Sequence, residues 1–297
     1  MKTASASAAC AALLKNVPRL MANPLGLPIG LQLYSVRDLL PKDYEGTLRQ
    51  LAAIGYREVE AAGFFGHSAS EVKQAMDRAG LRCVSAHYPM AELMPKVDEI
   101  IQFGKDLGLG YIICAWPMVD VPSHPKPEAL RGQITAMTLD DWRWNAEQFN
   151  GIGERMKAAG IRFGYHNHTA EFRAEDGVVI YDELLRLTDP AKVTMQMDCG
   201  WVVVGGKDPV DYLTRYPERF SLLHVKDFKM SAATAKATEA APPPSAELGR
   251  GTIDYRRIFE AAKKASIEHA FVEQEEFDMP AMEALKIDAD YMRALTV

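Results

Sequence analysis

The feature that most constrains the fold is a regular alternation of short apolar segments with helical patterns along the chain. Eight segments have the length and apolar character of buried strands. They are residues 29–35, 57–61, 82–87, 111–116, 162–168, 193–198, 220–226 and 270–275. A helical pattern follows each of them, at residues 44–54, 68–78, 94–107, 139–159, 181–187, 209–215, 255–265 and 282–295.

Eight strand–helix units are the count of a (β/α)8 TIM barrel, an α/β fold. We therefore predict that residues 28–297 form one such domain. The main alternative is a doubly wound open sheet, which usually carries a GxGxxG turn after an early strand. No turn in this sequence has that motif. The barrel is therefore the better prediction.

The composition excludes several other classes of protein. With 48% hydrophobic and 25% charged residues, the chain is typical of a globular protein. A net charge of −6 provides no electrostatic attraction to nucleic acid. No apolar run approaches the ~20 residues of a membrane span. Cys83 and Cys114 lie within apolar strand segments, so we expect both thiols to be buried.

Two segments depart from the alternation. Residues 1–27 are rich in small side chains, and we interpret them as an N-terminal arm or as the remnant of an export signal. The location of the protein therefore stays open between cytoplasm and periplasm. Residues 228–251 are rich in Ala and Pro. This long loop follows the carboxyl end of the seventh strand, where barrel active sites lie, so we favour a lid over a disordered insertion.

Polar side chains gather at the predicted carboxyl ends of the strands, the end at which TIM-barrel active sites lie. They are Glu60, His87, Trp116, His166, His168, Asp198, His224, Lys226, Asp227, Glu273 and Glu275. Those on strands five to eight can converge on one point, because these strands are neighbours in the barrel. Buried charges need partners or a metal, and imidazole with carboxylate suits Mn, Zn, Fe or Co better than Mg. The sequence therefore predicts a divalent metal site.

The spacing of these residues separates two roles. Side chains two residues apart in a strand share a face, as do His166 and His168, and likewise Glu273 and Glu275. In each pair we expect the member nearer the strand interior to bind the metal. The other member would then meet the substrate.

Motifs at these positions resemble the sugar phosphate isomerase/epimerase family, which has a xylose-isomerase-like barrel of the AP-endonuclease-2-like superfamily. They are GLQLYSVRD (30–38), IGYREVE (54–60), SAHYP (85–89), GYHNHTAEF (164–172), MDCGW (197–201), HVKD (224–227), LGRGTIDY (248–255) and VEQEE (272–276). The resemblance implies a divalent ion, often Mn²⁺, held by Glu, Asp, His and Glu on strands five to eight. Asp198, His224 and Glu273 match in type. His166 stands where many relatives have the first Glu.

The residues and the resemblance together predict a metal-dependent isomerase or epimerase that acts on a non-phosphorylated sugar or keto-sugar through an enediolate. The predicted metal ligands are His166, Asp198, His224 and Glu273, binding Mn²⁺ in the first place and Zn²⁺, Co²⁺, Fe²⁺ or Mg²⁺ as alternatives. The predicted acid–base residues are His166, His168 and Glu273. The predicted substrate-binding residues are His87, Trp116, Lys226, Arg250 and Glu60. A phosphate group is disfavoured, because no glycine-rich cradle or arginine cluster is present.

Other functions stay open. In sugar epimerases of the family that this chain resembles, a Glu on strand five and a Glu on strand eight act as an acid–base pair. Because His166 replaces the first of these carboxylates, the first alternative is a lyase that uses the same enolate chemistry, either a keto-sugar dehydratase or a 3-keto-glycoside eliminase. A DNA-repair endonuclease shares the barrel but needs more metal ligands and a basic face. A non-catalytic sugar-binding module is a further alternative. The expected partner is a small-molecule sugar, without nucleic acid or membrane, and barrels of this kind often form homo-oligomers.

Overall fold

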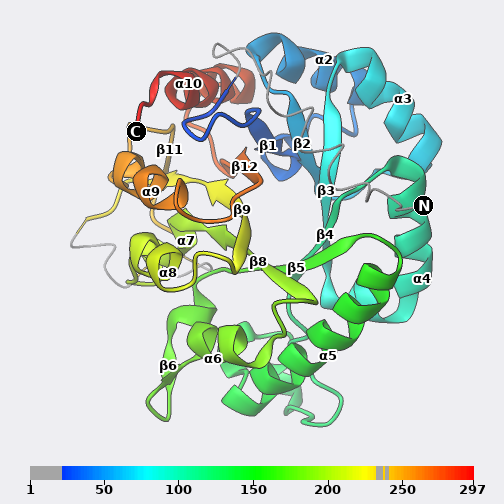
Figure 1. Cartoon of the computed structure of the whole chain (residues 1–297), viewed down its shortest axis with the longest axis vertical. Helices are drawn as coiled ribbons and strands as arrows, with labels where there is room; N and C mark the ends of the chain where they lie inside the picture. Colours follow the sequence, from blue (N-terminus) through cyan, green and yellow to red (C-terminus); the bar gives the residue numbers. More distant parts are fainter. Residues whose placement is uncertain (1–21, 232–236, 238–240) are drawn as a thin grey trace, which may run out of the picture.

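The computed structural model of the chain describes residues 22–231, 237 and 241–297. Its centre is a closed barrel of eight parallel strands in the order β1-β12-β9-β8-β5-β4-β3-β2 (Figure 1). The strands are β1 (Gly30–Gln32), β2 (Glu58–Ala61), β3 (Arg82–Pro89), β4 (Tyr111–Trp116), β5 (Arg162–His166), β8 (Val193–Asp198), β9 (Phe220–Val225) and β12 (His269–Val272). The prediction of a single-domain (β/α)8 TIM barrel is therefore confirmed.

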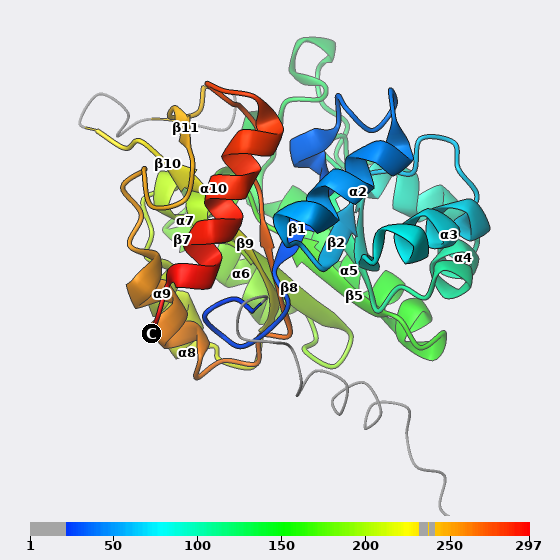
Figure 2. The same ribbon diagram turned by 90° about the horizontal axis from the view of Figure 1, so that it is seen from above.

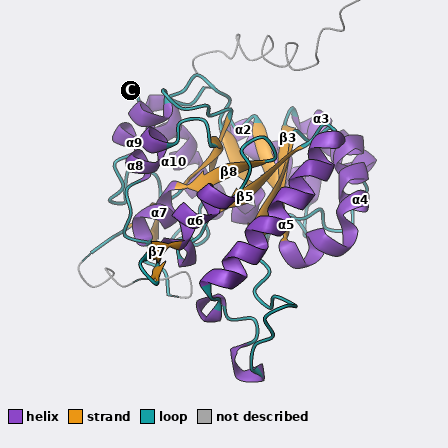
Figure 3. Cartoon of the chain, turned by 60° about the horizontal axis from the view of Figure 1, so that its bottom comes forward, coloured by secondary structure: helices purple, strands orange, loops and turns teal. Residues whose placement is uncertain are grey.

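Helices surround the barrel and cover the outer face of its strands (Figure 3). They are α2 (Tyr44–Ile54), α3 (Ala69–Ala79), α4 (Met90–Leu107), α5 (Leu139–Ala158), α6 (Ile180–Leu187), α8 (Pro209–Arg215), α9 (Tyr255–Ala262) and α10 (Ala281–Ala294). A further short helix, α7 (Cys199–Val204), directly follows β8. The last helix, α10, packs against α2 and so closes the ring (Figure 2).

Local sequence signals fix several helix boundaries. The Ser68 side chain accepts a hydrogen bond from the backbone N–H of Glu71, and the Glu71 carboxylate accepts one from the backbone N–H of Ser68, which forms a capping box at the start of α3. Gly80 ends the same helix with a left-handed φ of +73°. In the middle of α4, Lys96 departs from helical geometry directly after Pro95. Proline removes a backbone donor, which accounts for this kink.

Four predicted strands are too long at their carboxyl ends. The seventh and eighth stop at Val225 and Val272 rather than at residues 226 and 275. The other two are the first and the fifth. The first strand stops at Gln32, whose side chain accepts a hydrogen bond from the Tyr34 backbone and caps the short 3-10 helix η3 (Leu33–Val36). The fifth strand stops at His166. The next residue, Asn167, bonds both the backbone N–H and the carbonyl of Asp198 at 3.1 and 3.3 Å. Side-chain hydrogen bonds to the backbone therefore end the first and fifth strands early.

Smaller elements lie in the connections between strands and helices. Two antiparallel pairs are β6 (Ala174–Glu175) with β7 (Val178–Val179), and β10 (Asp227–Phe228) with β11 (Ser245–Ala246). Three further 3-10 helices are η4 (Glu128–Leu130), η5 (Ile134–Ala136) and η6 (Ala170–Phe172). Within the described residues, no helix has the length and hydropathy required to cross a bilayer.

The barrel interior contains an apolar layer in which Ile113, Leu222 and Phe271 are fully buried. Glycine makes room for two of these side chains. A Cβ at Gly30 would lie 2.6 Å from Phe271, and a Cβ at Gly164 would lie 2.7 Å from Ile113. The buried polar side chains of the candidate site lie closer to the carboxyl ends of the strands. Cys83 and Cys114 are buried free thiols, as predicted.

The segment 228–251 is anchored at its base. The buried carboxylate of Asp227 accepts backbone hydrogen bonds from Gly249, Gly251 and Ile253, each at 3.1 Å. Residues 232–236 and 238–240 of this segment lie outside the described residues, so the lid stays a prediction. The same is true of the arm or export signal, because residues 1–21 also lie outside them.

Candidate active site

A cavity of about 360 Å³ opens at the carboxyl ends of the strands. Several predicted site residues contribute to its wall. Its lining comprises Tyr34, Ala62, His87, Tyr88, Pro89, Ala115, Trp116, His166, His168, Glu273 and Glu275. The volume suits a single sugar ring rather than a polymer.

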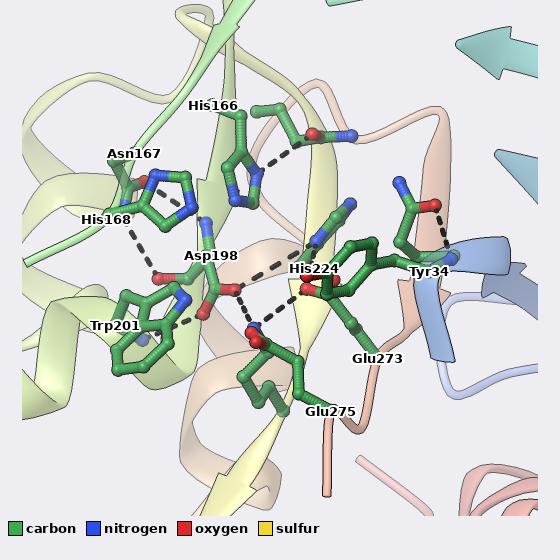
Figure 4. A network of polar contacts seen from close by, with 12 residues as sticks. Tyr34, His166, Asn167, His168, Asp198, Trp201, His224, Glu273 and Glu275 are labelled. Carbon is green, nitrogen blue, oxygen red and sulfur yellow. Dashed lines mark hydrogen bonds and ion pairs between the residues drawn. The ribbon is translucent and has the colours of Figure 1, made fainter. Parts of the chain in front are cut away.

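Four buried side chains converge beside this cavity (Figure 4). His166 ends β5, Asp198 ends β8, His224 lies in β9 and Glu273 follows β12. Each offers one nitrogen or oxygen atom, and these atoms all lie within 4.8 Å of one another. The structure thus brings together the four residues predicted as metal ligands, on four neighbouring strands.

Asp198 has the environment of a metal ligand. Its Oδ1 atom accepts a hydrogen bond of 2.8 Å from the Trp201 backbone and so caps α7. Its buried Oδ2 atom has no hydrogen-bond partner, although the Lys226 ammonium lies 3.3 Å away. Burial raises the pKa of Asp198, and the nearby lysine opposes this rise. A buried carboxylate oxygen without a donor is suited to a cation.

His224 lies between two carboxylates. Its Nδ1 atom is 2.9 Å from Oε2 of Glu273, and its Nε2 atom is 2.6 Å from Oε1 of Glu60. Burial alone would lower the pKa of His224, but these carboxylates raise it to about 10. Both ring nitrogens face acceptors, so the ring carries two protons in the absence of a cation. A cation would replace the proton on Nδ1, and Glu60 would keep the ring oriented through Nε2.

Glu60 lies behind the ligands rather than on the cavity wall. Besides His224, its two oxygens accept hydrogen bonds from Gln32 at 2.8 Å, Ser85 at 2.5 Å and Gln196 at 2.8 Å, and its Oε1 lies 2.8 Å from His87. Burial would raise the pKa of Glu60, but the histidines hold it well below its usual range. The carboxylate therefore organises the site, and a contact with substrate has no support in this geometry.

Gln196 connects three of these groups. Its Oε1 atom lies 2.6 Å from Nε2 of His87 and 3.0 Å from Nδ1 of His166. Gln196 was not among the residues predicted from the sequence. Its signal was an amide side chain inside the mostly apolar strand β8, two residues before Asp198 and thus on the same face. With Nδ1 held by Gln196, His166 can present Nε2 to a cation.

Lys226 contributes a buried positive charge to the site. Its Nζ atom lies 2.9 Å from Glu273 and 2.5 Å from Glu275, in addition to its ion pair with Asp198. Burial would lower the pKa of Lys226, but the three carboxylates raise it well above its usual value. The predicted role of Lys226 was substrate binding. The structure places its ammonium within the carboxylate cluster and not on the cavity wall.

Comparisons with known proteins agree with this architecture. Residues 48–295 match the family model described as xylose isomerase-like TIM barrel. The chain belongs to this family. An inosose dehydratase from Lacticaseibacillus casei is 22% identical over 249 residues, which cover 79% of this chain and 83% of that protein. An inosose dehydratase from Geobacillus kaustophilus is 24% identical, with 71% and 73% covered.

Solved structures also match this xylose isomerase-like barrel. A sugar phosphate isomerase/epimerase from Parabacteroides distasonis is 30% identical with a TM-score of 0.69, covering 90% of this chain and 93% of that one. A zinc-containing structure of the IOLI protein is 11% identical with a TM-score of 0.66, covering 89% and 97%. The second likeness concerns the fold alone. The named relatives are lyases and isomerases, so the chain belongs to a family of enzymes.

In this chain, His168 and Trp116 form one wall of the cavity. The ring centroid of His168 lies 5.1 Å from Trp116 and 4.8 Å from His166. Burial lowers the pKa of His168 to about 3, and the charge of Lys226 acts in the same direction. The imidazole is therefore neutral at physiological pH, and one of its ring nitrogens carries no proton. Trp116 offers an apolar edge beside it.

Two further predicted substrate contacts occupy different places. His87 lines the cavity, and its ring stacks on His224 with centroids 5.3 Å apart. Arg250 does not line the cavity. Its half-exposed side chain lies 3.5 Å from Glu247. Tyr34, by contrast, lines the cavity mouth with 41% of its surface exposed.

Proposed function

We propose that the protein is a metal-dependent lyase that acts on a non-phosphorylated keto-sugar or inosose. It would remove the proton next to the ketone and expel the group on the following carbon. The observation that carries this proposal is His166 at the fifth-strand position, where the resemblance implies the first carboxylate of the epimerase pair. Epimerisation requires one group that removes the proton from one face of the carbon and a second group that returns a proton to the opposite face. Elimination requires only one group that takes the proton and gives it to the leaving oxygen.

The protein residues would divide this work. His168 is neutral, lines the cavity and would take the proton from the carbon next to the ketone. It would then give that proton to the departing oxygen. Trp116 would pack against the sugar ring, and Tyr34 would cover the cavity mouth. The Lys226 ammonium would hold Glu273 and Glu275 in place.

The donor set fits a divalent cation, for which His166, Asp198, His224 and Glu273 would be the ligands. A bound cation would act as a Lewis acid toward the substrate oxygen on which negative charge develops. Two imidazoles and two carboxylates favour Mn²⁺, Zn²⁺, Fe²⁺ or Co²⁺ over Mg²⁺. The Oδ2 atom of Asp198 is buried and accepts no hydrogen bond, its nearest charge being the Lys226 ammonium at 3.3 Å, and this supports the assignment independently of the resemblance.

The cavity wall supports a substrate without phosphate. None of the residues that line the cavity is Lys or Arg, whereas two of them, Glu273 and Glu275, are carboxylates. A phosphate dianion would therefore meet negative charge without a fork of donors. Neutral hydroxyl and ketone groups would meet imidazole, tyrosine and carboxylate side chains. This wall favours a neutral sugar or cyclitol.

One experiment separates the two classes of reaction. The Mn²⁺-loaded protein would be incubated in D₂O with an inosose, a ketohexose and a 3-keto-glucoside, and the products analysed by mass spectrometry and NMR. Loss of water or of an alcohol supports the lyase. Deuterium incorporation at carbon without loss of any group supports an isomerase or epimerase instead. The Asp198→Asn variant serves as the control for contaminating activity.

The isomerase or epimerase is the second candidate, and two observations favour it. The Parabacteroides distasonis protein that is 30% identical carries that name. The cavity also contains two groups that can exchange protons, since both His168 and Glu273 line it. This function shares the cation, the ligands and the first proton transfer with the lyase. It differs in the fate of the proton and in the absence of a leaving group.

A further inference from the structure

A second cavity of about 490 Å³ adjoins the candidate active site. It lies between the loop after β2 and helix α4. Four residues, Ala62, His87, Tyr88 and Pro89, line both cavities. The two cavities therefore adjoin along the carboxyl end of β3, and a group attached to a sugar ring in the first would lie beside the second.

The second cavity has an aromatic wall. The ring centroid of Phe64 lies 4.5 Å from Phe103 on α4 and 6.4 Å from Tyr88 at the end of β3. Ile100 adds a further apolar side chain. Rings at these separations leave faces and edges on which another planar ring can pack. The wall is thus built for an apolar, flat group.

The loop that carries Phe64 has an unusual backbone. Gly63 and Gly66 flank the two phenylalanines with φ values of +96° and +80°. Phe65 between them has a φ of +53°, which is strained for a side chain of its size, and 40% of its surface is exposed. A local strain at the edge of a cavity is typical of functional loops. The turn at these glycines directs Phe64 toward Phe103.

Apart from His87 and the Tyr88 hydroxyl, which belong to both cavities, the polar side chains of the second cavity lie at its edge. Glu92, Lys96 and Glu99 line it from α4, and all three side chains are exposed to solvent. His67 is half-buried at the loop. A second sugar ring would need several directed hydrogen bonds, whereas this wall offers aromatic surface. An aromatic or similarly planar apolar group matches the lining better.

We propose that this second cavity binds a planar apolar group attached to the sugar in the first cavity, so that the substrate is a glycoside with an aromatic aglycone. The proposal rests on the lyase function above. In the reaction, the base takes the proton from the carbon between the ketone and the anomeric carbon. The electron pair of that C–H bond becomes a C=C bond, and the C–O bond to the aglycone breaks. The aglycone oxygen keeps the electron pair of the broken C–O bond and takes up a proton, which releases a phenol and an unsaturated keto-sugar.

Binding and chemistry are tested with separate probes. Phenyl and methyl glucosides of both anomers lack the ketone and cannot eliminate, so calorimetric titration of the Mn²⁺-loaded protein measures binding alone. We expect the better-bound phenyl glucoside to bind at least tenfold more tightly than its methyl counterpart. Phe64→Ala would reduce this preference to about twofold or less, since it removes the ring on which the phenyl group packs. Phe103→Leu, a milder change on α4, would reduce it in the same direction.

The matched control is Phe65→Ala in the same loop, since Phe65 does not line the second cavity and its loss would leave the preference within twofold. Equal binding of the phenyl and methyl glucosides, or absence of binding by both, would overturn the proposal. So would a preference that survives both Phe64→Ala and Phe103→Leu. The 3-keto forms of the same glucosides test the chemistry separately. If they yield no phenol or methanol, the lyase fails, while the measured binding preference still decides the role of the second cavity.

Discussion

The Nε2 atom of His224 lies 2.6 Å from Oε1 of Glu60, a fully buried carboxylate behind the candidate metal ligands. This hydrogen bond orients the imidazole so that Nδ1 faces Asp198 and Glu273. Carboxylates in this position typically contribute 10- to 100-fold to metal affinity. We expect Glu60→Gln to weaken Mn²⁺ binding by about that factor, as measured by competition with a chelator.

A suitable control for this variant lies on the same strand. Glu58 is also buried, but it bonds Arg82 and His269 at the opposite end of β2. Glu58→Gln removes a buried carboxylate of the same kind away from the site. It should leave Mn²⁺ affinity within about twofold. An equal loss of affinity in both variants would show that Glu60 acts on overall stability and not on the ligand.

Cation binding should release a proton. The pKa of His224 is raised to about 10 without a cation, because Glu273 and Glu60 outweigh burial. The ring therefore carries two protons at pH 7, and Nδ1 must lose one before it can bind a cation. Apparent Mn²⁺ affinity should consequently rise about tenfold per pH unit between pH 6 and 8. Calorimetry in buffers of different ionisation enthalpy should detect about one proton released, and a pH-independent affinity would contradict this account.

Removal of His168 should separate chemistry from cation binding. This side chain lines the cavity but is not one of the four clustered ligands. We expect His168→Gln to lower kcat by about 100-fold or more, the usual contribution of a positioned base. Mn²⁺ affinity should change by less than about threefold. A kcat within a few-fold of wild type would assign the proton transfer to another group.

Asp288 on α10 should make stability depend on pH. Burial raises its pKa to about 7, against about 3.9 in an unfolded chain. The folded protein then holds a proton that the unfolded chain loses, so stability decreases as the pH rises from about 4 to 7. Asp288→Asn keeps an acceptor for the Leu248 backbone and cannot ionise. It should stabilise the protein by up to about 4 kcal/mol at pH 8 and hardly at all at pH 4.

Chemical denaturation at both pH values measures this difference. The control is Asp290→Asn on the same helix, because Lys286 and Arg293 lower the pKa of that exposed carboxylate. Asp290 therefore contributes no loss of stability between pH 4 and 8. If the Asp288→Asn variant is no more stable relative to wild type at pH 8 than at pH 4, the buried carboxyl has found a partner that this structure lacks.

The sequence predicted the barrel because eight mostly apolar strand segments alternate with eight helical patterns. The predicted ends of the first and fifth strands were wrong because side chains bond the backbone there. Gln32 and Asn167 form side-chain hydrogen bonds to the backbone, with Tyr34 and Asp198 respectively. The partner of Asn167 is 31 residues away, so no local pattern reveals that bond.

The site shows a similar division. The four clustered donors could be predicted, since alternation along a strand and the order of strands place them on one face at one mouth. The depth of Glu60 and Lys226 could not be predicted in this way. Both have polar side chains at strand ends, yet the first lies behind the ligands and the second lies among the carboxylates. The depth of a side chain along the barrel axis depends on how the strands are staggered when the barrel closes, and the sequence of one strand does not reveal this.

The central claim is that His166, Asp198, His224 and Glu273 hold one divalent cation. Titration of the metal-free protein with Mn²⁺, followed by electron paramagnetic resonance, counts bound ions directly. We predict one tight Mn²⁺ per chain in the wild-type protein and loss of that site in Asp198→Ala. A wild-type protein that binds no Mn²⁺, Zn²⁺, Co²⁺ or Fe²⁺, or an Asp198→Ala variant that binds Mn²⁺ as tightly as wild type, would contradict the account.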